Sequence, residues 1–259
     1  MFDTLEKAGG QSCQATNFLK TFSSLPEALR LNLLEEHSHA GSLTDMLQAA
    51  CRFILGQTSA DYKRIVNNTF GFEKIFGIDA LASIRCTHCH NETIRPGGTF
   101  ITELIYPALP SPNSRQARSQ SLTSLPTFCQ ALKASIELQI QTRGWCDKCR
   151  RYQSLSTRKA LRNVPQVFML NAACKTAEAK RYWSEPGWLP DRIGVVVDSG
   201  KFFCLQGEDL RGHLRKGIHE ITVYDLVGVV ADIHSGENQK SHLVSLINGK
   251  CNRAMVTIA

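Results

Sequence analysis

Two Cys-x-x-Cys pairs, at residues 86–89 and 146–149, constrain this chain more than any other feature of its sequence. Thiolates three residues apart across a tight turn can point at one ion, and two such turns supply the four ligands of a tetrahedral zinc site. Because the interval between the pairs is long, the second turn must return from a distant segment. We therefore predict one structural zinc ion, with the ligands Cys86, Cys89, Cys146 and Cys149.

Other interpretations of these cysteines stay open. They can be unrelated buried residues, or one pair can be a redox dithiol, although a redox pair lies at a helix N-terminus after a strand and neither pair has that setting. His88 or His90 can replace one of the sulfur ligands. A zinc site closed by four thiolates leaves no open coordination position, so we expect it to fix the fold and not to catalyse a reaction.

The chain has ten cysteines among 259 residues, which is many for an intracellular protein. Residues 1–6 show no basic start or apolar core of a signal peptide, and no stretch reaches the ~20 apolar residues of a membrane helix. We therefore expect a cytoplasmic protein without a membrane anchor. In that setting the cysteines outside the two pairs are expected to be free thiols, namely Cys13, Cys51, Cys129, Cys174, Cys204 and Cys251.

The net charge is +7, the Lys and Arg residues are dispersed along the chain, and the densest basic cluster, at residues 148–151, is short. We interpret most of these charges as solvated faces and not as a nucleic-acid-binding surface. Cys13 begins a predicted helix, where the helix dipole lowers a thiol pKa. Because no turn that presents a catalytic thiol precedes Cys13, we do not assign it as a nucleophile.

The first third of the chain has helical periodicity. We predict helices over residues 13–22, from Pro26 and from Leu43, the last capped by Ser42. In the first helix Phe18, Leu19 and Phe22 share one face. In the second, Leu29, Leu33 and Leu34 are expected to face inward, and in the third the apolar residues follow helical spacing, namely Leu43, Met46, Leu47, Ala50, Phe53 and Ile54.

From about Phe70 the pattern changes to strands, interrupted by an exposed loop at 107–127 and by an amphipathic helix that carries Phe128, Leu132, Ile136 and Ile140 and ends near Gly144. The turn residues at 198–200 predict a hairpin. No element is expected within 249–259. The predicted strands are 78–84, 93–94, 99–106, 167–170, 193–197, 201–205, 223–233 and 243–247.

The order of these segments resembles the ubiquitin-specific-protease fold of the papain-like superfamily, in which a helical thumb, zinc-bearing fingers and a β palm follow one another. The resemblance implies an α+β fold. It places the thumb at 1–69, the fingers at 70–152 and the palm at 153–248. These form one partial domain, 1–248, truncated at both ends and followed by a divergent tail at 249–259.

Four segments, at 13–22, 52–55, 144–149 and 224–227, resemble one branch more closely. This branch comprises the pseudo-ubiquitin-hydrolase domains in the catalytic subunits of Pan poly(A)-specific deadenylase complexes. The resemblance implies a non-catalytic scaffold that acts in mRNA poly(A)-tail shortening in the cytoplasm, including processing bodies. The implied partners are the pseudokinase adaptor subunit of the complex and, through it, poly(A)-binding protein.

Departures from the protease pattern decide the expected activity. A cysteine protease needs a thiol nucleophile, a general base and a residue that orients the base, and the family's cysteine box lies upstream of the position that Met1 matches. His242 stands where the family has its base, and we interpret it as a strand-edge histidine, not a vestigial base. We also expect the deadenylase subunit's exonuclease domain to be missing, and therefore expect no catalytic residue in this chain.

Two further functions are kept as hypotheses. An active cysteine deubiquitinase would use His242 as its base, with a nucleophile not recognised in the sequence. A free-standing zinc module would bind nucleic acid, but aromatic and basic residues do not alternate along the sequence as expected of a stacking platform, so we rank this function last.

Overall fold

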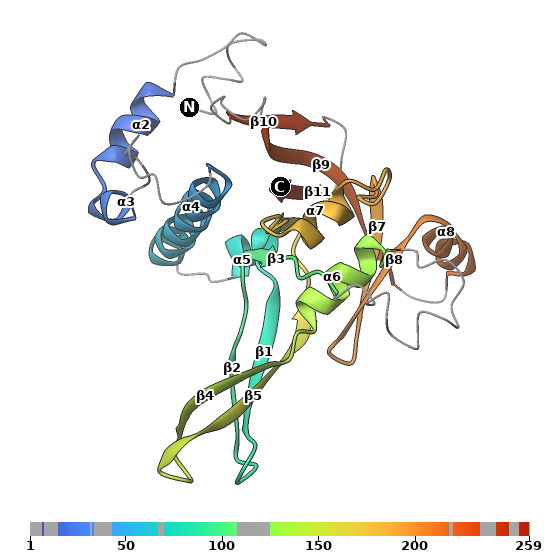
Figure 1. Ribbon diagram of the computed structural model, residues 1–259. Helices are drawn as coiled ribbons and strands as arrows, with labels where there is room; N and C mark the ends of the chain where they lie inside the picture. The colour runs from blue at the N-terminus through green and yellow to red at the C-terminus, as the bar shows by residue number, and fades with distance from the viewer. Residues whose placement is uncertain are drawn as a thin grey trace.

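The computed structural model describes residues 7, 15–31, 33, 43–66, 70–107, 125–217, 220–233, 242–248 and 254–258. A group of helices and a large sheet form the body of the molecule, and a long, narrow ribbon of strands projects from it (Figure 1). The chain is therefore a mixed α and β structure with the three-part layout that the sequence predicts. Of the described helices, none combines the length and the apolarity that crossing a bilayer requires.

Four helices begin the described chain: α2 (Thr16–Ser23), α3 (Pro26–Arg30), α4 (Leu43–Val66) and α5 (Phe70–Phe76). The ring of Phe22 packs edge-on against Phe53, with centroids 5.7 Å apart, and so joins α2 to α4. The predicted inward position of Leu29 is wrong, since 53% of its surface is exposed and Ala28 is buried instead. Leu34 and Ser42 lie outside the described residues.

Residues 70–76 form a helix where the sequence pattern predicted the start of the strands. Phe72 and Phe76 are four residues apart, and their rings meet at 5.1 Å on one face of α5. Phe72 also packs edge-on against Phe100, with centroids 5.7 Å apart. The contact between Phe72 and Phe76 needs helical spacing, which a strand does not provide.

The projecting ribbon is an antiparallel sheet with the strand order β2-β1-β5-β4, and we call it the fingers sheet. Its strands are β1 (Asp79–Cys86), β2 (Glu92–Pro96), β4 (Ile140–Cys146) and β5 (Arg151–Asn163). The sequence predicted that Ile140 continues the preceding helix, but Ile140 begins β4. That helix, α6 (Phe128–Ile136), starts at a capping box between Thr127 and Gln130.

The body contains a mixed sheet of order β3-β6-β11-β9-β7-β8, with β10 paired to β9. As predicted, β7 and β8 form a hairpin, and Ser199 and Gly200 at its turn both have positive φ values, 50° and 77°. The strands are β3 (Ile101–Glu103), β6 (Val167–Asn171), β7 (Arg192–Asp198), β8 (Lys201–Gln206), β9 (Thr222–Ile233), β10 (His242–Ile247) and β11 (Ala254–Ile258).

Strand β11 lies in the segment for which the sequence predicted no element. It pairs in parallel with β6 on one side and with β9 on the other. Parallel pairing with two distant strands leaves no local turn signal in the sequence. The predicted loop at 107–127 is described only at its ends, since 108–124 lie outside the described residues.

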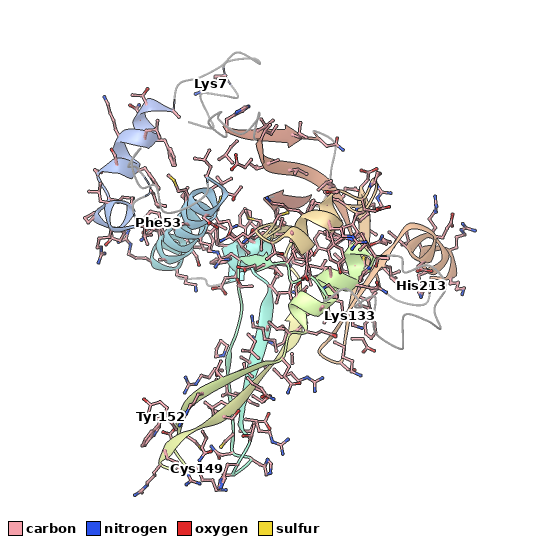
Figure 2. The ribbon with its side chains drawn as sticks, in the orientation of Figure 1. Lys7, Phe53, Lys133, Cys149, Tyr152 and His213 are labelled. Carbon is pink, nitrogen blue, oxygen red and sulfur yellow. A yellow bond between two sulfur atoms is a disulfide. The ribbon has the colours of Figure 1, made fainter. Side chains whose placement is uncertain are left out.

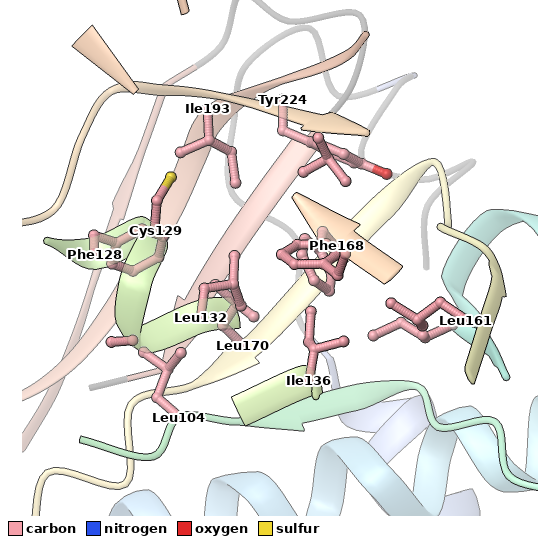
Figure 3. Close-up of a cluster of buried hydrophobic side chains, with 14 of the residues drawn as sticks. Leu104, Phe128, Cys129, Leu132, Ile136, Leu161, Phe168, Leu170, Ile193 and Tyr224 are labelled. Carbon is pink, nitrogen blue, oxygen red and sulfur yellow. The ribbon is translucent and has the colours of Figure 1, made fainter. Parts of the chain in front are cut away.

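The hydrophobic core lies between this sheet and α6 (Figure 3). Leu132 and Ile136 of α6 approach Phe168 and Leu170 of β6, and all four side chains are buried. The helices α7 (Ala177–Trp183) and α8 (Gly207–Lys216) complete the described body, and Tyr182 of α7 is fully buried. The core thus holds the body together without a contribution from the far end of the fingers sheet.

Cys129 and Cys204 form a disulfide, with Cα atoms 5.1 Å apart. The prediction of free thiols is wrong for these two residues. The reason is tertiary packing, because α6 lies against β8 and brings the two side chains within bonding distance. Cys51 and Cys174 are free thiols, as predicted.

Candidate metal centre

The two Cys-x-x-Cys turns meet at the far end of the fingers sheet. Cys86 is the last residue of β1, and Cys146 is the last residue of β4. Strand β5 lies between β1 and β4 and pairs with both, so it aligns the two turns side by side. Cys149 lies at the extremity of the ribbon, far from the body (Figure 2).

The four sulfur atoms form one compact group. The Sγ atoms of Cys86 and Cys149 are 3.9 Å apart, those of Cys89 and Cys146 are 3.5 Å apart, and all four lie within 4.8 Å of one another. A zinc ion with Zn–S bonds of about 2.3 Å sets the edges of a sulfur tetrahedron at about 3.8 Å. The spacing and the donor set therefore fit a tetrahedral metal ion bound by four thiolates.

The backbone of each turn is shaped to aim its sulfurs inward. In the first turn the Cys86 carbonyl accepts a hydrogen bond from the His90 N–H, at 3.0 Å. The N–H and the hydroxyl of Thr87 both donate to the Ser154 carbonyl, each at 3.0 Å. These two bonds fix the first turn to β5, the strand that also carries the second turn at its start.

The electrostatics of the group favour a bound cation. Backbone hydrogen bonds, first from Cys89 and then from His88, lower the pKa of the Cys86 thiol to about 6. Burial and the neighbouring sulfurs raise the pKa of the Cys149 thiol to about 12. Without a metal ion the four sulfurs therefore cannot all be thiolates at neutral pH, and a divalent cation would supply the charge that lets them ionise.

The structure places His88 beside this group. Its Nδ1 is 3.6 Å from Cys149 Sγ, and its Nε2 is 3.2 Å from a guanidinium nitrogen of Arg151. His90 is exposed. The four sulfurs complete a tetrahedral donor set without either histidine, so His88 acts as a neighbour that contacts one ligand from outside.

His242 begins β10 opposite Ile233 and is exposed. Within the described part of the chain it makes no hydrogen bond to a cysteine or a carboxylate. Burial raises the pKa of the thiols of Cys51 and Cys174, which keeps these two protonated and weakly nucleophilic. Cys13 and Cys251 lie outside the described residues.

The supporting residues of the site were not predicted from the sequence. Arg151 and Ser154 contact the first turn from β5, although they follow the second Cys-x-x-Cys pair in the chain. The alternation of side-chain direction along β5 could have revealed them, once β5 is recognised as the partner of β1.

The family model described as ubiquitin carboxyl-terminal hydrolase matches residues 1–255. The catalytic subunit PAN2 of the PAN2–PAN3 deadenylation complex from Phaeosphaeria nodorum is 50% identical over 251 residues, which is 96% of this chain and 22% of that protein. The corresponding subunit from Emericella nidulans is 48% identical over 248 residues, which is 96% of this chain and 21% of that protein. The chain thus spans about a fifth of these curated relatives.

Solved structures show the same similarity. The Neurospora crassa Pan2 catalytic unit, with protease and nuclease domains, aligns with a TM-score of 0.78 and 34% identity over 95% of this chain and 41% of that one. The Saccharomyces cerevisiae PAN2 pseudoubiquitin-hydrolase aligns with a TM-score of 0.66 and 18% identity over 95% of this chain and 61% of that one. At that identity the yeast structure supports the fold alone.

Proposed function

The chain belongs to the ubiquitin carboxyl-terminal hydrolase family, and from this premise we propose that it is a non-catalytic scaffold domain of a deadenylase subunit that acts in mRNA poly(A)-tail shortening. The relatives from P. nodorum and E. nidulans carry the name of a deadenylation-complex subunit, which supports this assignment.

One observation in the chain itself carries the proposal. Among the described residues, one histidine ring contacts a cysteine sulfur. His88 contacts Cys149, and this cysteine belongs to the candidate metal group. A cysteine protease requires such a pair at its reaction centre, with the thiol free to attack. A sulfur engaged in a closed metal site cannot serve as that nucleophile.

We propose zinc as the metal of the four-cysteine group. All four donors are cysteine sulfurs, which is the ligand set of a structural zinc site. Cys86, Cys89, Cys146 and Cys149 would hold the ion. Its contribution would be to lock two turns that no hydrophobic core supports, so the ribbon keeps its shape at a distance from the body.

The proposed partners are the pseudokinase adaptor subunit of the deadenylase complex and, through it, poly(A)-binding protein. The names of the relatives, which place them in the PAN2–PAN3 complex, support an adaptor partner. The cytoplasm, including processing bodies, is the proposed location.

A pair of assays on the purified zinc-loaded chain tests this function. Incubation with a ubiquitin C-terminal fluorogenic amide should release no fluorophore, while binding to the purified adaptor should be measurable by calorimetry. Hydrolysis that iodoacetamide abolishes would replace the scaffold by an active cysteine deubiquitinase. Absence of adaptor binding, with zinc content and folding intact, would refute the scaffold role.

A further inference from the structure

The fingers sheet has an exposed aromatic pair close to the metal group. Trp145 of β4 and Tyr152 of β5 are opposite each other in the register, and their rings meet edge to face with centroids 5.7 Å apart. Trp145 is 54% exposed and Tyr152 is 63% exposed. Tyr152 lies near the end of the ribbon, close to the position of Cys149 (Figure 2).

Three arginines share the face of the sheet that carries this pair. Alternate residues of a strand point to the same face, and so do residues opposite each other in antiparallel strands. On β5, positions 152, 154, 156 and 158 therefore share one face. Arg143 is opposite Ser154, Arg85 is opposite Ser156, and Arg158 is opposite Ser83. We call Trp145, Tyr152, Arg143, Arg85 and Arg158 the aromatic–arginine face.

The opposite face of the same sheet carries the residues that hold the fingers together. Cys86 is opposite Leu155, and both point to the face that carries Cys146. The aromatic pair therefore contributes nothing to the metal group. A cross-strand aromatic pair stabilises a hairpin, which explains the contact between the two rings but neither their exposure nor the arginines beside them.

The charge of the chain is concentrated on this ribbon. Residues 79–96 and 139–163 contain nine Lys and Arg and three Asp and Glu, a net charge of +6 within a total of +7 for the chain. Four thiolates around a divalent ion would add a formal charge of −2 at its end. Arg85, Arg143 and Arg158 are exposed, and in the described part of the chain no carboxylate oxygen lies within 4.0 Å of their side-chain nitrogens.

We propose that the aromatic–arginine face binds single-stranded RNA, with bases stacked on Trp145 and Tyr152 and phosphates paired with the three arginines. Single-strand binding surfaces combine a positively charged track with exposed rings on which bases stack. Positions 152 to 158 of β5 extend for about 20 Å at the rise of a strand, which is long enough for several nucleotides. The proposal is independent of the scaffold function.

The charge attracts both RNA and an acidic protein, and the geometry of the two rings favours RNA as the occupant. An edge-to-face arrangement leaves ring surface open for stacking, whereas a protein partner would need an apolar pocket for an anchor side chain. Two pockets among the described residues are lined from the body and the base of the ribbon, and neither includes Trp145 or Tyr152.

Tryptophan fluorescence provides a direct test on the zinc-loaded chain. Trp188 is buried and Trp183 is half-buried, so Trp145 is the tryptophan that an added RNA can reach. Titration with a short single-stranded RNA at low salt should quench the emission, and the quenching should be lost in Trp145→Phe. Fluorescence anisotropy of the labelled RNA gives the affinity in parallel.

Two matched pairs of variants locate the binding surface. Tyr152→Ala should weaken binding by about 5–150-fold, as expected for the loss of one stacking platform, while Tyr152→Phe should bind like the parent. Arg158→Ser should weaken binding and reduce the slope of log K against log salt by about 0.7. Lys159→Ser changes the same charge on the opposite face and should leave both quantities unchanged.

Three results would overturn the proposal, given variants that retain zinc and unfold at the parent temperature. The first is an absence of quenching and of anisotropy change at low salt. The second is an equal effect of Arg158→Ser and Lys159→Ser, which would mean diffuse attraction without a defined face. The third is that poly-glutamate binds as tightly as RNA and that Tyr152→Ala weakens both to the same extent. That result would assign the face to an acidic protein.

Discussion

His90 and Arg150 occupy equivalent positions in the two Cys-x-x-Cys turns. Each directly follows the second cysteine of its pair, and each has a left-handed backbone, with φ values of 57° and 50°. Residues other than glycine adopt this conformation at a cost, and β-branched residues avoid it. The matching backbone shows that both turns reverse the chain in the same way to aim their sulfurs at one point.

This backbone predicts a difference between two neutral substitutions of Arg150. Both Arg150→Asn and Arg150→Val remove the charge, but asparagine tolerates a positive φ and valine does not. We expect the valine variant to be less stable than the asparagine variant by about 1 kcal/mol. Denaturant unfolding of the zinc-loaded proteins measures the difference, and equal stabilities would show that the turn is not left-handed at this position.

The contact of His88 with Cys149 predicts a secondary role for the histidine. His88→Ala should leave the zinc content of the chain unchanged, because four sulfurs complete the donor set. Cys89→Ser in the same turn should lose the metal. Zinc analysis after gel filtration compares the two variants, and loss of zinc from His88→Ala to the extent seen in Cys89→Ser would make the histidine a ligand.

The pKa shifts of the sulfur group predict how metal affinity depends on pH. The Cys149 thiol, with its pKa raised to about 12, must lose a proton when the metal binds, so affinity rises with pH. Below about pH 6 the Cys86 thiol is protonated too and a further proton must leave, so the dependence becomes steeper. Competition with a chelator over a pH series measures this, and a pH-independent affinity would contradict it.

The core predicts unequal costs for two phenylalanine truncations in the body. Phe168 is fully buried in the core, whereas Phe203 on β8 is 39% exposed and lies under the Lys133 ammonium group, 4.8 Å from its ring centre. Phe168→Ala should cost about 3–5 kcal/mol in unfolding free energy. Phe203→Ala should cost much less, and similar losses in thermal or denaturant unfolding would show that the core is misplaced.

The elements with local signals could be predicted from the sequence. The four cysteines of the candidate metal group repeat a spacing, β7 and β8 flank a turn at Ser199 and Gly200, and β6 is a continuous apolar run. In each case the residues that define the element are neighbours in the chain. The α+β architecture and the family resemblance rested on the same local features.

The features that depend on distant segments could not be predicted. Strand β11 is defined by parallel partners far away in the chain, and the disulfide between Cys129 and Cys204 depends on how α6 packs on β8. The alternation of aromatic and basic residues is missing along the sequence because the sheet creates it across strands. Trp145 and Arg143 share a face with Tyr152 and Arg158 only because of the register of β4 on β5.

Metal analysis of the purified chain tests the central claim most directly, with Cys86→Ser and Cys149→Ser measured separately. The account predicts one zinc ion per chain in the parent and none in either variant, although 63 positions separate the two cysteines. Cooperative unfolding of the fingers sheet should be lost with the metal. A parent chain without zinc, or a variant that keeps both the ion and the cooperative transition, would contradict the account.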